Sequence, residues 1–255
     1  MENQNNFNLP VAIVVSAFIL SGAWIYSQKP SSDNKAAVFR DDEPHSESET
    51  VLPVKWGDLG LKMISVGVID PEKFESLYSD RGGLTDDTKR ILYEENNGNL
   101  KITPKNSGEI LNLLWALGLG NKNDVLDKGP MKDPRYGGVG DFASVGGWIL
   151  ADSDAVNHYS RHPLIMLTRD QQALVERVAK NVYRPCCKNS TYFPDCNHGM
   201  AMLGLLELMA SQGVSEKEMY DSAAKVNAYW FPELNQNAGS PCAVEAQPQT
   251  SGCAI

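Results

Sequence analysis

The stretch from Gly199 to Ser211 is apolar on every side of a helix, and Glu207 is its only charged residue. A helix without a polar face cannot lie at the surface of a folded domain, so this one is expected at the centre. The buried charge of Glu207 then requires a partner, for which Arg184 and Lys225 are the candidates. The sequence therefore predicts a mainly α fold, a compact multi-helix domain built around a buried central helix.

Further helices are predicted between residues 51 and 232, which we expect to form the globular domain. Residue types that favour helix N-termini precede apolar positions at helical spacing. The predicted starts are Asp70 with Pro71, Thr85, Asn106 with Glu109, Thr168 with Gln171, and Ser215 with Glu218. Few runs of β-branched residues are long enough for strands, and Gly118 is expected to end the helix that follows Asn106.

The segment from Leu9 to Tyr26 carries no charge over eighteen residues. A helix of that length spans about 30 Å, the thickness of the membrane hydrocarbon. We therefore expect residues 1–27 to form an N-terminal signal anchor or transmembrane helix. A cleaved signal peptide is the alternative, because Ser21, Gly22 and Ala23 fit a small-residue cleavage site. With its short polar head and acidic linker, this N-terminal region resembles the signal anchors of bacterial surface-exposed proteins, which implies a placement at the membrane.

Two polar segments flank the predicted domain. Residues 28–50 are acidic and lack apolar periodicity, which is typical of a disordered linker, and residues 233–255 form a predicted disordered tail that carries Cys242 and Cys253. Lys and Arg residues follow the segment 9–26 but do not precede it, and this count alone places the chain after the segment in the cytoplasm. The linker and the paired tail cysteines instead suit an oxidising exterior. We expect a single-pass protein of the cell membrane whose C-terminal domain lies outside the cytoplasm.

The net charge of −9, with a pI near 5.0, argues against a nucleic-acid partner. Binding to phosphate groups requires clustered Lys and Arg side chains, and the sequence contains no such cluster. The expected partner is the membrane, and no particular protein partner is indicated.

Three of the five cysteines and one histidine lie within thirteen positions, directly before and at the start of the central helix. They form the pattern Cys-Cys-x8-Cys-x-His and are Cys186, Cys187, Cys196 and His198. Three thiolates and one imidazole are the ligands of a closed tetrahedral metal site. A helix N-terminus favours both the thiolate and the neutral imidazole, which are the forms that bind metals. The sequence predicts a site for a thiophilic ion, copper or zinc.

Additional ligands are available near this pattern and upstream of it. Closed zinc sites prefer spaced cysteines, so the adjacent pair and the thioethers of Met200 and Met202 favour copper(I). Methionines on an apolar helix are, however, more often core residues. His158 and His162 are four residues apart and share one face if they lie on a helix. Pro163 disfavours a helix at His162, which leaves a surface or capping role as the alternative.

Two other functions fit the same cysteines. Cys196 can form a disulfide with Cys186 or Cys187 that staples the loop to the helix, and Cys242 can pair with Cys253 or with the core. Such a chain is a surface interaction domain without catalysis. A redox-active thiol protein is the second alternative, although the Cys-x-x-Cys spacing of thioredoxin-like enzymes is missing. No catalytic residue is predicted, and an enzyme is the less favoured interpretation.

Overall fold

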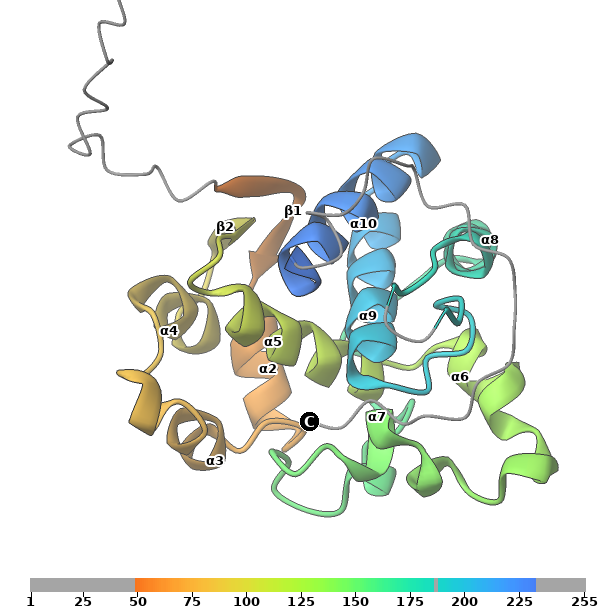
Figure 1. The fold of residues 1–255 in the computed structure, drawn as a ribbon, viewed down its shortest axis with the longest axis horizontal. Helices are drawn as coiled ribbons and strands as arrows, with labels where there is room; N and C mark the ends of the chain where they lie inside the picture. Colours follow the sequence, from red (N-terminus) through yellow and green to blue (C-terminus); the bar gives the residue numbers. More distant parts are fainter. Residues whose placement is uncertain (1–48, 186–187, 233–255) are drawn as a thin grey trace, which may run out of the picture. The chain divides into compact units, whose positions relative to one another are not determined.

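The computed structural model describes residues 49–185 and 188–232, which Figure 1 draws as the coloured ribbon. About 57% of the described residues are helical, which confirms the mainly α prediction. The predicted membrane segment 9–26, nearly all of the linker and the tail 233–255 lie outside the described residues. Within the part that is described, no helix is both long enough and apolar enough to cross a membrane.

The described chain contains helices joined by short 3-10 turns, and one pair of strands. The helices are α2 (Leu59–Ser65), α3 (Pro71–Ser76), α4 (Asp86–Tyr93), α5 (Ser107–Gly120), α6 (Asp124–Lys128), α7 (Ala143–Gly146), α8 (Arg169–Asn181), α9 (Asn197–Ser211) and α10 (Glu216–Trp230). The 3-10 turns are η1 (Ser79–Arg81), η2 (Pro130–Lys132), η3 (Pro134–Tyr136), η4 (Val139–Asp141) and η5 (Ala155–Asn157). The strands are β1 (Thr50–Gly57) and β2 (Asn97–Ile102).

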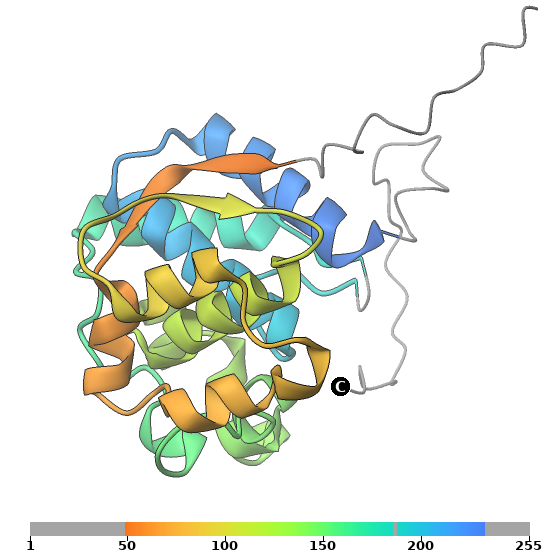
Figure 2. The same cartoon turned by 90° about the vertical axis from the view of Figure 1, so that its left-hand side faces the viewer.

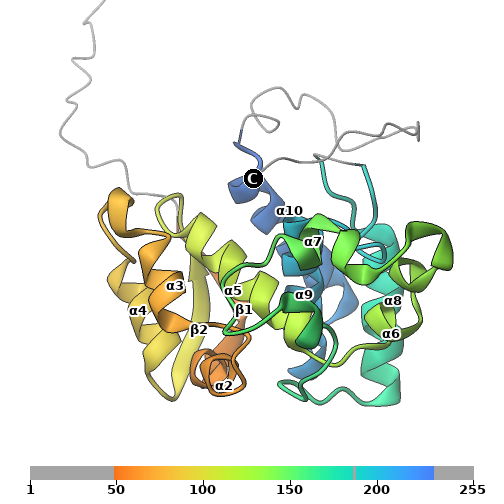
Figure 3. The same cartoon turned by 90° about the horizontal axis from the view of Figure 1, so that it is seen from below.

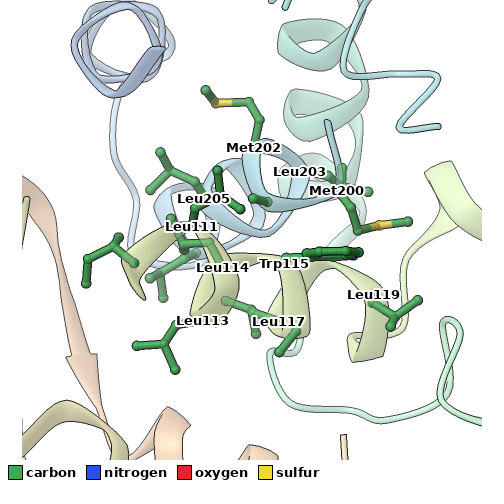
Figure 4. Close-up of a cluster of buried hydrophobic side chains, with 14 of the residues drawn as sticks. Leu111, Leu113, Leu114, Trp115, Leu117, Leu119, Met200, Met202, Leu203 and Leu205 are labelled. Atoms are coloured by element: carbon green, nitrogen blue, oxygen red, sulfur yellow. The ribbon is translucent and has the colours of Figure 1, made fainter. Parts of the chain in front are cut away.

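Helix α9 is the predicted central helix, and it is buried from Gly199 to Ala210. It crosses α5, whose residues from Glu109 to Gly120 are also buried with the exception of Asn112. The two backbones meet where Gly118 of α5 faces Gly204 of α9, because a Cβ atom on either residue would collide with the other helix. Leucines and Trp115 fill the space on both sides of the crossing (Figure 4). Gly118 therefore lies inside α5 and does not end it, contrary to the prediction.

Helices and strands cover the crossing from opposite sides. In the view of Figure 3, α3, α4 and β2 lie beside α5, whereas α6 and α8 lie beyond α9. Helix α8 packs directly on α9, and α10 contacts α5, α8 and α9. These layers bury the apolar stripe of each outer helix against the central pair.

The antiparallel pair of β1 and β2 was not predicted. Leu52, Val54 and Trp56 alternate with exposed residues along β1 and point into the core. The register shifts between Val51 and Lys55, around Pro53, which cannot donate a ladder hydrogen bond. Strand β1 runs along α10 (Figure 2) and begins at Thr50, a residue that the sequence assigned to the linker.

Four of the five predicted helix starts are capped by side chains as expected. Asp70, Thr85, Thr168 and Ser215 each accept a backbone hydrogen bond from the first turn of α3, α4, α8 and α10. The predicted capping box of Asn106 and Glu109 is wrong. The Asn106 side chain accepts from the backbone N of Thr103, and Glu109 accepts from the backbone N and the hydroxyl of Thr85. Glu109 therefore ties the start of α4 to α5.

Candidate functional site

The candidate site lies at the N-terminus of α9, where Cys196 occupies the N-cap position. The chain reaches this position through a narrow hairpin after α8. Tyr183 forms an antiparallel bridge with Ser190, and the backbone N of Thr191 donates to Val182 O at 2.8 Å. The predicted ligands Cys186 and Cys187 lie outside the described residues.

Arg184 holds the segment between the hairpin and α9. Its side chain has no exposed surface, and its guanidinium donates to three backbone oxygens. These are Phe193 O at 2.7 Å, Ser190 O at 3.2 Å and Asn189 O at 3.3 Å. Gly199 makes room for the guanidinium, because a Cβ atom there would lie 2.5 Å from Arg184 Nη1. The shape of the loop therefore depends on one buried cation and one glycine.

The same guanidinium contacts Cys196 and Asp195. Nη1 of Arg184 donates to Cys196 Sγ at 2.9 Å and to Asp195 Oδ1 at 2.7 Å. Asn189 donates to the other carboxylate oxygen of Asp195 at 2.9 Å. Asp195 balances the charge of Arg184, and a cation in contact with a sulfur atom favours the thiolate over the thiol. Sequence reasoning missed this partner of Cys196, although Arg184 is the only cation directly before the cysteine pair.

His198 lies two residues beyond Cys196 and packs against the end of α10. Its ring is 4.5 Å from the ring of Phe231 and 5.8 Å from that of Trp230, measured between centroids. The Nδ1 atom is 2.9 Å from the Asn197 side-chain oxygen. Because that oxygen only accepts, Nδ1 carries the proton, and the lone pair of the neutral ring is on Nε2. His198 therefore offers Nε2 to a ligand.

The glycine-rich segment before α7 borders this site. The segment 184–196, which precedes α9, is called the cysteine loop below. The ring centroid of its Phe193 is 5.3 Å from that of Tyr136 and 5.5 Å from that of Phe142. The backbone N of Ser144 donates to Asp195 O at 3.1 Å. Aromatic side chains and α7 thus form a partly exposed rim beside the Arg184 and Cys196 pair.

The other predicted ligands occupy different surroundings. Met200 and Met202 have no exposed surface and belong to the hydrophobic core, where Met200 lies beside Trp115 (Figure 4). The predicted disulfide partners Cys242 and Cys253 lie outside the described residues. Across residues 49–185 and 188–232, no three His, Cys, Asp or Glu side chains are grouped so that they could hold a metal ion.

His158 and His162 come together, although not on a common helix. His158 follows η5, and a turn with Ser160 at φ +50° brings His162 back to it. Their ring nitrogens are 3.0 Å apart. Burial lowers the pKa of His162 below its usual value, the charges of His158 and Arg161 act in the same direction, and Asp152 opposes them.

Glu207 is fully buried, and its partners are not the predicted Arg184 or Lys225. The side-chain amides of Asn121 and Asn123 donate to its two carboxylate oxygens, at 2.7 Å for Asn121. Burial raises the pKa of Glu207 well above its usual value, and the two amide hydrogen bonds oppose that shift. Two neutral amides satisfy the oxygens without supplying a compensating charge, which leaves burial as the dominant effect on this carboxyl group.

Comparison with known proteins finds no protein-family model that matches the chain, no similar curated protein and no similar solved structure.

Proposed function

We propose that this protein is a membrane-anchored, extracytoplasmic protein that binds a thiophilic metal ion, copper(I) or zinc, through Cys186, Cys187, Cys196 and His198. The observation that carries the proposal is the 2.9 Å contact between Arg184 Nη1 and Cys196 Sγ. The contact favours the thiolate, which is the form of cysteine that binds metals. A guanidinium beside several thiolates also offsets their mutual repulsion.

Covalent geometry supports the inclusion of the adjacent cysteines. The backbone N of Lys188 donates to Arg184 O at 3.0 Å, so the chain on both sides of Cys186 and Cys187 is fastened to Arg184. Two peptide steps from Arg184 to Cys186 span at most about 7.6 Å. Arg184 is thus close to both adjacent cysteines along the chain and contacts Cys196 through Nη1, which supports a shared site for the three sulfur atoms. The Nε2 atom of His198 is the fourth ligand in the proposal.

The burial of Cys196 favours an ion over a protein substrate. Only 6% of the residue is exposed. A disulfide of another protein must approach a sulfur atom along the S–S axis to exchange with it, which requires open surface. A bare ion does not require that surface.

The test uses the full-length chain in mild detergent, reduced and kept without oxygen. Copper(I) is added against a coloured competing ligand, and the bound ions are counted by native mass spectrometry. We expect one ion per chain. Cys196→Ser is expected to weaken binding by more than the roughly 10- to 100-fold that follows loss of an outer-shell partner. The paired variant Cys242→Ser and Cys253→Ser is the matched control and should bind as the natural chain does.

A redox-active thiol site is the second candidate, because the Arg184 contact also makes Cys196 a better leaving and attacking group in thiol exchange. Oxidation of two thiols to a disulfide releases two protons and gives two electrons to a small disulfide such as oxidised glutathione. A disulfide potential well above about −300 mV, in a chain that retains no copper, would replace the metal proposal by this one. A chain with neither property, whose mass is lower by two hydrogens per bridge, would be the stapled interaction domain.

A further inference from the structure

The pair of His158 and His162 has its own hydrogen-bond partners, which differ from those of Cys196. Nε2 of His158 is 3.2 Å from Asp152 Oδ1 and 2.9 Å from Ser153 Oγ. An ionised carboxylate only accepts, so Nε2 of His158 carries a proton. Nδ1 of the neutral His158 ring therefore presents its lone pair, and it is this atom that faces His162 Nε2 at 3.0 Å.

The backbone around the pair is fixed to the end of α5. The backbone N of His162 donates to Gly120 O at 2.8 Å, and the backbone N of Lys122 donates to His162 O at 2.9 Å. Asp152 is fixed as well, since its backbone N donates to Gly67 O at 2.9 Å and its carboxylate lies against Gly67. His158 is buried and His162 is half-buried, so an ion can reach the pair from the side of His162.

We propose that His158 Nδ1 and His162 Nε2 bind one divalent ion of the kind that prefers imidazole, Zn²⁺ or Cu²⁺, at a site separate from the cysteine loop. Asp152 is the positioning residue, because a histidine that binds a metal commonly donates its other ring N–H to a carboxylate. Two nitrogens that bind the same tetrahedral Zn²⁺ at about 2.0–2.1 Å are about 3.3 Å apart. The pair therefore needs to open by a few tenths of an ångström. The proton that His162 Nε2 donates to His158 Nδ1 also moves to His162 Nδ1, so that both facing nitrogens present a lone pair to the ion.

Other molecules must fill the remaining coordination positions of the ion. The structure groups no third His, Cys, Asp or Glu side chain with this pair in the residues it describes, so water or a ligand from another molecule completes the coordination. Two protein ligands make an exchangeable site rather than a permanently loaded one. The positive charge of Arg161 opposes the ion, and the carboxylate of Asp152 attracts it.

The experiment measures Zn²⁺ binding to the full-length chain in mild detergent by calorimetry. ¹⁵N NMR of the histidine rings identifies the nitrogens that bind. Beyond any zinc that the cysteines hold, we expect one Zn²⁺ with shifts at His158 Nδ1 and His162 Nε2, loss of that binding in His162→Gln, and affinity lower by about 10- to 100-fold in Asp152→Asn. His162→Gln is the main variant because the ring is half-exposed and its loss leaves the core intact. His158→Gln is the second variant.

His198→Gln is the matched control, because it removes an imidazole from the proposed site for the thiophilic ion and leaves His158 and His162 in place. It should leave the zinc shifts at His158 and His162 unchanged, and Cys196→Ser should do the same. Unaltered zinc binding in a folded His162→Gln variant would overturn the proposal, as would zinc shifts confined to His198. The two proposals fail separately, since Cys196→Ser reports on the thiophilic ion and His162→Gln on this one.

Discussion

A single nitrogen of Arg184, Nη1, donates to both Cys196 Sγ at 2.9 Å and Asp195 Oδ1 at 2.7 Å. The guanidinium side chain is completely buried, and it also donates to backbone oxygens of the cysteine loop. One cation thus sets both the conformation of the loop and the electrostatic surroundings of the sulfur atom. The relationship joins the fold of the hairpin to the chemistry proposed for it.

Arg184→Met should destabilise the domain strongly. The change removes one partner of a buried ion pair and leaves the oxygen of Phe193 without its donor, which typically costs about 3–5 kcal/mol. Urea unfolding followed by circular dichroism measures the free energy of unfolding. Arg177→Met, which breaks the exposed pair with Glu216, is the matched control and should cost about 0–1 kcal/mol. Equal losses in the two variants would contradict the organising role of Arg184.

Gly199→Ala should disturb the contact between Arg184 and Cys196. The new Cβ atom would lie 2.5 Å from Nη1 and 2.8 Å from Cζ of Arg184, so the guanidinium must move away from Cys196. We expect slower alkylation of Cys196 near neutral pH in the reduced chain, and a stability loss of about 1–3 kcal/mol. Peptide mass spectrometry with iodoacetamide gives the alkylation rate of each cysteine.

The control for Gly199→Ala is Gly98→Ala in β2, where nothing lies within 4 Å of an added Cβ atom. Its Cys196 alkylation rate should equal that of the natural chain. A rate that also stays unchanged in Gly199→Ala would mean that the guanidinium does not influence the thiolate.

Glu207→Gln should change how stability depends on pH. Burial raises the pKa of Glu207 well above 4.5, so from about pH 4.5 upward the folded chain holds a proton that the unfolded chain releases. The stability of the natural chain therefore falls as pH rises through this window, by up to about 1.4 kcal/mol per pH unit. A glutamine side chain does not titrate, so this contribution is absent from the variant.

At pH 4 the glutamine variant should be the less stable chain. Its side-chain NH₂ replaces an acceptor and faces an asparagine donor, which costs about 1–3 kcal/mol. Asn121 cannot turn its oxygen to Glu207, because that oxygen accepts from the backbone N of Ile165 at 2.8 Å. The stability difference should shrink or reverse as pH rises, as measured by urea unfolding at several pH values. A constant difference would contradict the raised pKa, and Glu176→Gln on the exposed face of α8 is the control.

The central helix and the five helix starts could be predicted because each depends on a short stretch of sequence, although the side-chain cap expected at Asn106 is absent. An apolar segment without a polar face must be buried, and Thr168 with Gln171 forms the same cap in any context. The strand pair depends on longer-range contacts. Pro53 interrupts the alternation of β1, and β2 contains only Leu100 and Ile102 as apolar residues, so neither strand is evident before the two are paired.

The candidate site was predictable in location but not in its contacts. The grouping of cysteines before an apolar helix placed Cys196 at the start of α9. Its contact with Arg184 requires the missing Cβ atom of Gly199, which no spacing rule indicates. The contact between His158 and His162 could not be predicted from spacing either, because it results from a turn at Ser160 and not from helical periodicity.

Gly204→Ala should test whether the crossing of α5 and α9 holds the domain together. The added Cβ atom would lie 2.7 Å from the backbone N of Gly118 and still closer to the backbone oxygen of Leu114, and neither can move without displacing α5. Overpacking of this kind typically costs about 1–3 kcal/mol and sometimes more. In a helix that did not touch another backbone, the same change would stabilise by about 1 kcal/mol. Gly108→Ala, at the open first turn of α5, is the matched control and should stabilise slightly. Thermal unfolding of both variants shows whether each substitution stabilises or destabilises the domain. A stabilised Gly204→Ala chain would show that the two helix backbones are not in contact.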